Sequence, residues 1–76
     1  MKHQTDEELY SIIGANIKKY RELSGLTQNQ LAEKLQISIS YVSKLEAPGC
    51  NKSISISLLN HIANELGTNI TCFFTK

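Results

Sequence analysis

A short run of residues near the middle of the chain combines side chains that can contact the edges of DNA bases. The Lys44 ammonium can donate to O6 and N7 of guanine or to a phosphate, whereas serine hydroxyls donate or accept with little discrimination. Ile39 can cover a thymine methyl group, or it can serve as a partly buried spacer. The predicted base-reading residues are Ile39, Ser40, Ser43 and Lys44. Because this set discriminates weakly, we expect DNA shape or a dimer to supply much of any sequence specificity.

A second group of residues is suited to contact the phosphates of a DNA backbone. Gln28 begins a helical segment, and the free N–H groups and positive dipole end of a helix N-terminus favour an anion. The alternative for Gln28 is a solvent-exposed residue of the first helical turn. Lys52 is either a phosphate contact or a solvated charge. The predicted phosphate-binding residues are Gln28, Asn29, Tyr41, Asn51 and Lys52.

The residue pattern supports no other chemistry. The sequence contains no nucleophile–base pattern, glycine-rich phosphate loop or cluster of metal ligands, so we expect no enzyme activity, cofactor, metal ion or small-molecule ligand. His61 has no second ligand-type residue at metal spacing. Cys50 and Cys72 match no zinc or redox motif and are expected to be free thiols, with redox sensing as the minor alternative.

Two short helical segments, with almost no linker between them, must position the base-reading residues. The first begins at Thr27, whose hydroxyl can cap free backbone N–H groups with Gln30 as the reciprocal partner. Ser38 is placed to cap the second. Only residues 36–38 separate them, and helices joined by so short a turn cross steeply, as in a helix-turn-helix over residues 28–47. Their apolar faces consist of Leu31, Ala32 and Leu35, and of Val42 and Leu45.

This arrangement resembles the Cro and phage-repressor type of helix-turn-helix, also called the XRE family. The likeness runs from about residue 13 to residue 74. It implies a compact, all-α, five-helix lambda-repressor-like fold, with the helix-turn-helix as helices 2 and 3 and double-stranded DNA as the partner. The residues that carry it are Gly25 to Gln28, Leu31 to Leu35, Ile37, Ser38, Ser40 to Glu46, Ile62, Ala63, Leu66 and Gly67.

The resemblance also implies roles for individual residues. Arg21 would pair with Glu46 and so orient the base-reading helix, because the guanidinium fork can hold a carboxylate with two bonds. Direct phosphate contact is the alternative for Arg21. Gln28 would contact phosphate and support the base-reading helix. Gln36 departs from the family pattern, which commonly has glycine at positive φ there, and we expect a strain of about 1 kcal/mol.

The flanking segments are expected to complete the helical core. Thr5 and Glu8 form a predicted capping box for a helix over 6–24 that Gly25 ends. Residues 47–53 form a loop, Ser55 caps the next helix, and Asn69 caps a last turn over 70–74. One C-terminal phenylalanine is expected to complete the core while the other joins an apolar dimer patch, although a monomer with a folded-back C-terminus is an alternative. The predicted dimer-interface residues are Ile70, Phe73 and Phe74.

Composition bounds the class of protein. The chain has 76 residues, of which 41% are hydrophobic and 7% aromatic with no Trp, so we expect one domain over 1–76 with an aliphatic core. A net charge of +1 permits DNA binding without demonstrating it. There is no apolar run of about 18 residues and no signal peptide, so we expect a cytoplasmic protein without a membrane partner.

Together these features predict a sequence-specific DNA-binding regulator that acts as a homodimer on a pseudo-palindromic operator. Repression by covering a promoter is favoured over activation. The alternative is an antitoxin or accessory protein that uses the same helices to hold another protein. Salt-dependent, sequence-specific affinity for DNA would separate these two functions.

Overall fold

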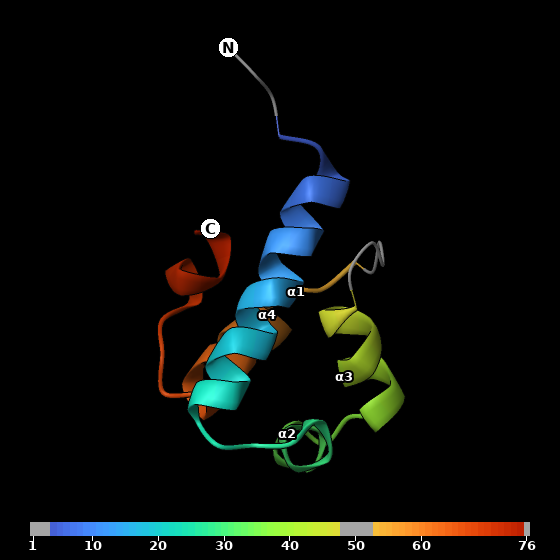
Figure 1. The fold of residues 1–76 in the computed structure, drawn as a ribbon, viewed down its shortest axis with the longest axis vertical. Coiled ribbons are helices and arrows are strands. Elements are labelled where there is room, and N and C mark those ends of the chain that lie inside the picture. The colour runs from blue at the N-terminus through green and yellow to red at the C-terminus, as the bar shows by residue number, and fades with distance from the viewer. Residues whose placement is uncertain (1–3, 48–52, 76) are drawn as a thin grey trace.

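The computed structural model describes residues 4–47 and 53–75 and contains four α-helices and one short 3₁₀ helix in those ranges. These elements are α1 (Asp6–Leu23), α2 (Gln28–Leu35), α3 (Ile39–Glu46), α4 (Ile56–Glu65) and η1 (Ile70–Phe74), as Figure 1 shows. The all-α class is confirmed. The expectation of five α-helices is wrong, because the last element has 5 residues and forms a tight 3₁₀ turn.

Side-chain caps start the helices at the predicted positions. In α1 the Glu8 amide donates to Thr5 Oγ1 and the Thr5 amide donates to Glu8 Oε1, both at 3.1 Å. In α2 the same reciprocal pair joins Thr27 and Gln30 at 3.1 and 2.8 Å. The remaining caps are Ser38 for α3, Ser55 for α4 and Asn69 for η1. Short-range chemistry therefore sets where each element begins.

Left-handed residues follow three of these helices and turn the chain: Gly25 after α1, Gln36 after α2 and Gly67, with a φ of +67°, after α4. Gly25, just beyond the end of α1, has a φ of +75°. Gln36, between α2 and α3, has φ 57° and ψ 43°, which confirms the predicted left-handed conformation without glycine. Its amide donates to the carbonyls of Ala32 and Glu33, so the strained residue also closes the end of α2.

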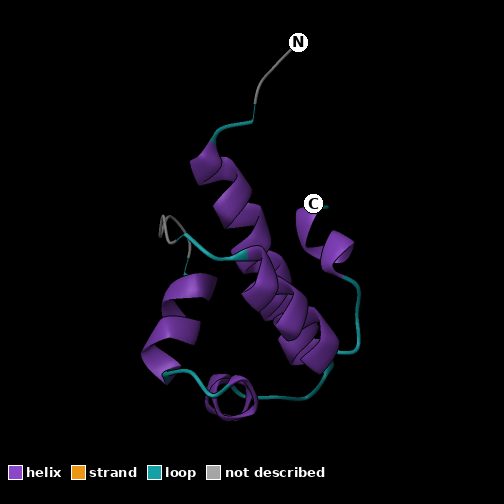
Figure 2. Cartoon of the chain, turned by 180° about the vertical axis from the view of Figure 1, so that it is seen from behind, coloured by secondary structure: helices purple, strands orange, loops and turns teal. Residues whose placement is uncertain are grey.

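The helices surround a single apolar core. α1 is the longest element; α4 lies behind it, α3 lies on one side, and η1 lies on the other (Figures 1 and 2). α2 crosses the end of this group beside the base of α3. The buried apolar residues are Ile13, Ile17, Leu31, Ala32, Leu35, Val42, Leu45, Leu59, Ile62, Ala63, Leu66 and Phe73. All but Phe73 are aliphatic, as composition predicted.

The two C-terminal phenylalanines have different environments. Phe73 is fully buried, with its ring edge-to-face against Tyr20 at a centroid distance of 6.1 Å. Phe74 is 43% exposed. One phenylalanine therefore completes the core, as expected. The assignment of Phe73 to a dimer interface is wrong for this fold, because its side chain is enclosed by its own chain.

Asn16 fastens η1 to α1. Its side-chain amide, buried where η1 packs against α1, donates to the backbone carbonyls of Phe73 at 2.9 Å and Thr75 at 2.7 Å. One side chain thus satisfies two acceptors that a 3₁₀ turn leaves open. This contact fixes the C-terminal segment in the position where Phe73 enters the core.

Gly14 allows α1 to lie against the end of α3. A Cβ on Gly14 would overlap the carbonyl oxygen of Leu45, whereas the Cα of Glu46, at 3.6 Å, would be in ordinary van der Waals contact. The obstructing carbonyl is part of the backbone, so it cannot rotate away. The absence of a side chain at residue 14 therefore sets the distance between α1 and α3.

We predict that Gly14→Ala destabilises the fold by about 1–3 kcal/mol, because the overlap outweighs the roughly 1 kcal/mol by which alanine favours a helix. Urea unfolding followed by circular dichroism measures the change. Ser11→Ala, on the exposed face of the same helix, is the matched control and should leave stability unchanged or slightly raised. Equal stability of Gly14→Ala and the parent would contradict the close approach.

We predict that Gln36→Gly stabilises the fold by about 0.5–1 kcal/mol. The substitution relieves about 1–2 kcal/mol of left-handed strain but adds chain entropy to the unfolded state. The same unfolding experiment tests this. Glu33→Gly, within α2, should instead lose about 1 kcal/mol. A loss of stability at both positions would show that Gln36 is not strained.

Candidate nucleic-acid interface

One shallow depression gathers most of the residues with DNA-contacting chemistry. It has a volume of about 370 Å³ and lies where the start of α2 meets α3. Its lining consists of Gln28, Ile39, Ser40, Ser43 and Lys44. The structure therefore brings all four predicted base-reading residues together with one predicted phosphate contact.

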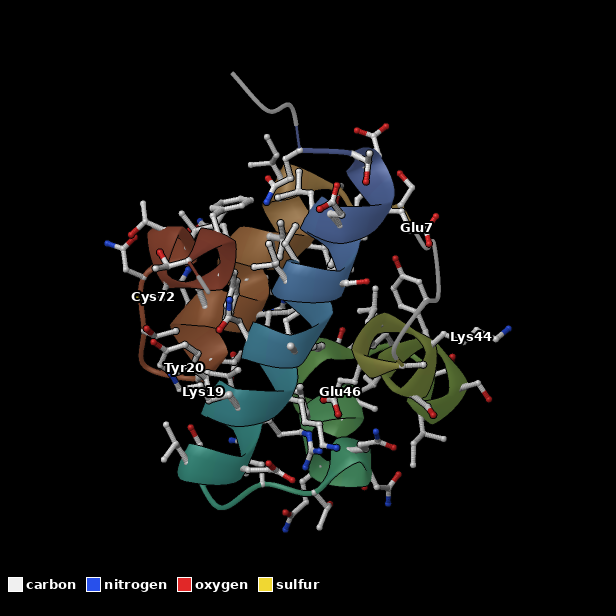
Figure 3. All side chains as sticks on the ribbon, turned by 45° about the horizontal axis from the view of Figure 1, so that its top comes forward. Glu7, Lys19, Tyr20, Lys44, Glu46 and Cys72 are labelled. Carbon is white, nitrogen blue, oxygen red and sulfur yellow. The ribbon has the colours of Figure 1, made fainter. Side chains whose placement is uncertain are left out.

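α3 presents these residues because its opposite face is buried. Val42 and Leu45 are 1% and 7% exposed, so they fix which side of the helix faces outward. The Lys44 side chain extends away from the body of the protein (Figure 3). Ile39 is 46% exposed, an unusual position for an isoleucine unless it meets an apolar group. The outward face of α3 thus offers a cation, two hydroxyls and a patch of aliphatic surface.

A buried ion pair holds α3 in this orientation. Arg21 Nε donates to Glu46 Oε2 at 2.7 Å and Arg21 Nη2 donates to Glu46 Oε1 at 2.9 Å. Arg21 Nη1 also donates to the Leu26 carbonyl at 2.8 Å. The hydrogen bonds to Glu46 raise the pKa of Arg21 above its usual value. Here the pairing suggested by the family resemblance links α1, the loop after it and the end of α3.

Gln28 joins the same carboxylate. Its Nε2 donates to Glu46 Oε1 at 3.0 Å, so the amide nitrogen points toward α3. The second Nε2 hydrogen and the amide oxygen stay available at the wall of the depression, which Gln28 lines. The role that the resemblance gave to Gln28, support of the base-reading helix, therefore has a direct hydrogen bond in the structure.

The two short helices both begin at the depression. Gln28 is the first residue of α2 and Ile39 is the first residue of α3, and both line the depression. Thr27 and Ser38 each cap one backbone N–H, which leaves the other first-turn N–H groups and the positive dipole ends. This arrangement makes the rim of the depression electrostatically favourable for anions.

Asn29 and Tyr41, the other predicted phosphate contacts among the described residues, do not line the depression. Asn29 is exposed in the first turn of α2. Tyr41 is half-buried and packs against the core, so its ring is more constrained than an exposed contact requires. Asn51 and Lys52 lie outside the described residues, as do Cys50 and most of the predicted loop.

Cys72 lies on the opposite side of the molecule from Lys44, near Tyr20 and Lys19 (Figure 3). It is a partly buried free thiol, as predicted. Hydrogen bonding from the Thr68 side chain, with further bonds from the Asn69 backbone and Tyr20, lowers the pKa of Cys72. Hydrogen bonding to Cys72 raises the pKa of Tyr20. These groups stabilise the contact between α1 and η1 and take no part in the depression.

Within residues 4–47 and 53–75, no three acidic, histidine or cysteine residues are grouped so that they could hold a metal ion. His61 instead lies 3.6 Å from Glu65, one turn along α4. In the same part of the chain, no helix has the length and apolar character needed to cross a membrane.

Comparison with known proteins decides the family. The HTH_3 helix-turn-helix family model matches residues 17–71, which include α2, α3 and α4. The chain belongs to the HTH_3 family. It is therefore a DNA-binding regulator of transcription of the XRE type, and this family is not enzymatic.

Individual relatives of this HTH_3 protein have similar sizes. The control protein C.SmaI of Serratia marcescens is 26% identical over 69 residues, which make up 91% of this chain and 80% of that protein. The clp gene regulator ClgR of Corynebacterium glutamicum, a protein of known structure, is 31% identical to this chain in sequence. The match covers 86% of this chain and 67% of the ClgR chain, with a TM-score of 0.77. The biofilm regulator SinR, solved in complex with DNA, is 30% identical to this chain. The match covers 83% of this chain and 98% of the SinR chain, with a TM-score of 0.74.

Two structural residues of this HTH_3 domain escaped the sequence-based predictions. Gly14 interrupts a helical pattern where glycine costs about 1 kcal/mol, and an isolated glycine of this kind is a signal of close backbone approach. Asn16 stands among the apolar residues of α1, and a polar residue on a buried face must find partners. Both signals were present, but neither identifies which segment makes the contact.

We predict that Glu46→Ala destabilises the domain by about 3–5 kcal/mol, because it leaves the Arg21 guanidinium buried without its counter-charge. Such a loss approaches the whole stability of a small domain. Urea unfolding with a Glu33→Ala control on the exposed face of α2 measures it. The double variant Arg21→Met/Glu46→Leu should recover part of the loss, because it removes both charges. If Glu46→Ala had the same urea midpoint of unfolding as the parent protein, the ion pair would not hold α3.

Proposed function

We propose that this protein is a sequence-specific transcriptional repressor that acts as a homodimer on a pseudo-palindromic operator. The observation that supports this most strongly is the depression in which Gln28 lies beside the outward face of α3. A recognition helix that enters the major groove needs an exposed polar face and a neighbouring phosphate contact, and the outward face of α3 and the adjacent Gln28 side chain are suited to these two roles.

In this proposal the base contacts come from α3. Lys44 donates to O6 or N7 of guanine, and the half-exposed Ile39 covers a thymine methyl group. Ser40 and Ser43 bond to base edges with little preference. Because only Lys44 discriminates strongly by hydrogen bonding, the spacing of two half-sites and the shape of the DNA between them contribute the remaining specificity.

The phosphate contacts position α3 over those bases. With one Nε2 hydrogen held by Glu46, the other is directed to donate to a phosphate at the rim of the depression. Gln28 therefore couples the backbone contact to the ion pair that orients α3. Asn29, Tyr41, Asn51 and Lys52 are proposed as further phosphate contacts on either side.

Dimer formation gives the operator its symmetry. Phe74 is 43% exposed and Ile70 is partly buried beside it in η1, which leaves apolar surface away from the depression. Two copies related by a two-fold axis would read half-sites about 34 Å apart, one turn of DNA. Repression then follows from occupation of promoter DNA. SinR, a solved relative, forms a complex with DNA.

Selection from random duplex DNA at two salt concentrations tests the proposal. We expect an enriched inverted repeat and an affinity that falls steeply as salt rises. Lys44→Ala should lose about 1–3 kcal/mol at preferred sites and relax the preference at one position of each half-site. Gln28→Ala should weaken all sequences similarly, because phosphates carry no sequence information.

The matched control is Lys34→Ala, because Lys34 is an exposed lysine of α2 that does not line the depression. It should preserve the base preference. Circular dichroism of Gln28→Ala checks that loss of its bond to Glu46 leaves the fold intact. Enrichment of no sequence, with weak binding even at low salt, would overturn the operator model and favour a protein partner.

A further inference from the structure

The outer face of α1 carries an apolar groove that the core does not use. The groove has a volume of about 310 Å³ and is lined by Ser11, Ile12, Ala15 and Asn16. A second hollow of about 260 Å³ adjoins it, since Glu7, Glu8, Ser11 and Ile12 line that one. The small residues Ser11 and Ala15 let another helix approach closely at this point.

Charges flank the groove in a fixed order along the helix. Glu7 and Lys18 are eleven residues apart, about three helical turns, so they lie almost in line along α1. Glu8 and Lys19 form a second line beside the first. Each line is acidic toward the N-terminus and basic toward the C-terminus, with small or apolar residues between. Glu22 lies between the two lines one turn beyond Lys18, so this end of the face carries two cations and one carboxylate, and the net charges of the two ends remain opposite.

We propose that this face of α1 is the surface on which a second copy of the chain docks, with the two α1 helices antiparallel. A two-fold interface must be complementary to itself, because the same patch is used twice. Antiparallel packing meets this requirement: it places the acidic end of each helix against the basic end of its partner. It also sets Ser11 of one copy opposite Ala15 of the other at the centre.

This inference rests on the proposed function and supplies the dimer surface that it needs. The groove is continuous with the C-terminal patch, because Asn16 lines the groove and holds the Phe73 and Thr75 carbonyls on either side of Phe74. Phe74 can therefore extend the same interface at its edge. Glu8 keeps its bonds to Thr5, so the pairing depends mainly on Glu7 and Lys18.

The geometry also suits an operator. At about 100° per residue, Gly14 and Arg21, which contact α3, lie roughly a third of a turn around α1 from Ala15. α3 accordingly lies to the side of α1, and the outer face of α1 points elsewhere (Figure 1). The two-fold axis of an antiparallel pair is perpendicular to the plane of the two helices. Rotation about that axis keeps both α3 helices on the same side, where one DNA duplex can meet both.

Charge reversal tests the interface without DNA. Sedimentation equilibrium of the full chain at low salt should show a dimer for the parent. Glu7→Lys and Lys18→Glu should each raise the dimer dissociation constant about tenfold or more, because each places two like-charge pairs across the axis. An equimolar mixture of the two variants should recover dimer, since the heterodimer has opposite charges at both contacts.

Controls separate charge pairing from folding. Asp6→Lys changes the charge by the same amount in the same helical turn but lies about 100° around the helix, so it should leave the dimer unchanged. Lys34→Glu is the matched control for Lys18→Glu. Ala15→Arg, a bulky substitution at an exposed site, should abolish the dimer without loss of helix content.

A monomeric parent, a dimer that survives Ala15→Arg, or a variant mixture no better than its components would each overturn this interface. None of these results depends on DNA. Operator selection that succeeds while the reversals have no effect would leave the proposed function intact and place the dimer contact elsewhere. If selection failed while the mixture of charge variants recovered the dimer, the interface would stand and the proposed function would be overturned.

Discussion

The carboxylate of Glu46 is the group on which the rest of this structure depends. It accepts two bonds from Arg21 and one from Gln28, so it ties α1, α2 and α3 together at one point. The side chain is almost fully buried, and a carboxylate is stable there only with its partners in place. Removal of any one partner therefore affects the others. The outward face of α3 therefore owes its orientation to a buried group that lies behind it.

Backbone proximity and electrostatics reinforce each other at this point. Gly14 brings α1 within backbone contact of Leu45 and Glu46, and the same proximity gives the Arg21 fork its reach. A wider gap would lengthen the bonds of the guanidinium, whose planar fork tolerates little misalignment. The depression beside α3 is thus a consequence of how tightly α1 and α3 approach.

Sequence predicted the local parts of this fold well. Thr5, Thr27, Ser38, Ser55 and Asn69 act on backbone groups two or three residues away, so their roles are legible in the chain itself. The positive φ of Gln36 came from the family resemblance, in which glycine is common at that position. The ion pair came from the family resemblance, because nothing local links residues 21 and 46. The depression itself was not predicted directly, because its shape depends on the angle at which α2 and α3 cross.

The burial of the C-terminal phenylalanines depends on contacts across the fold. Phe73 and Phe74 are adjacent and identical in type, so the local sequence does not distinguish them; in the fold, Asn16 binds the carbonyls on either side of Phe74, and the Phe73 ring packs against Tyr20. The fifth helix was implied by the family resemblance, whereas the residues themselves predicted a short last turn over 70–74, and η1 is a 3₁₀ helix of 5 residues. The bond between Asn16 and the Phe73 carbonyl joins residues 57 positions apart, which no local pattern encodes.

The shortness of α2 and α3 has one more consequence, for how DNA binding responds when the fold is destabilised. α2 and α3 have 8 residues each, far below the roughly 12–15 at which isolated helices become even marginally stable in water. The depression that these two helices form consequently exists only in the folded domain. Any perturbation that raises the unfolded fraction of the protein therefore lowers the concentration of folded protein that can bind DNA. Heat or a mutation in the distant core would therefore reduce DNA binding without changing any residue of α2 or α3.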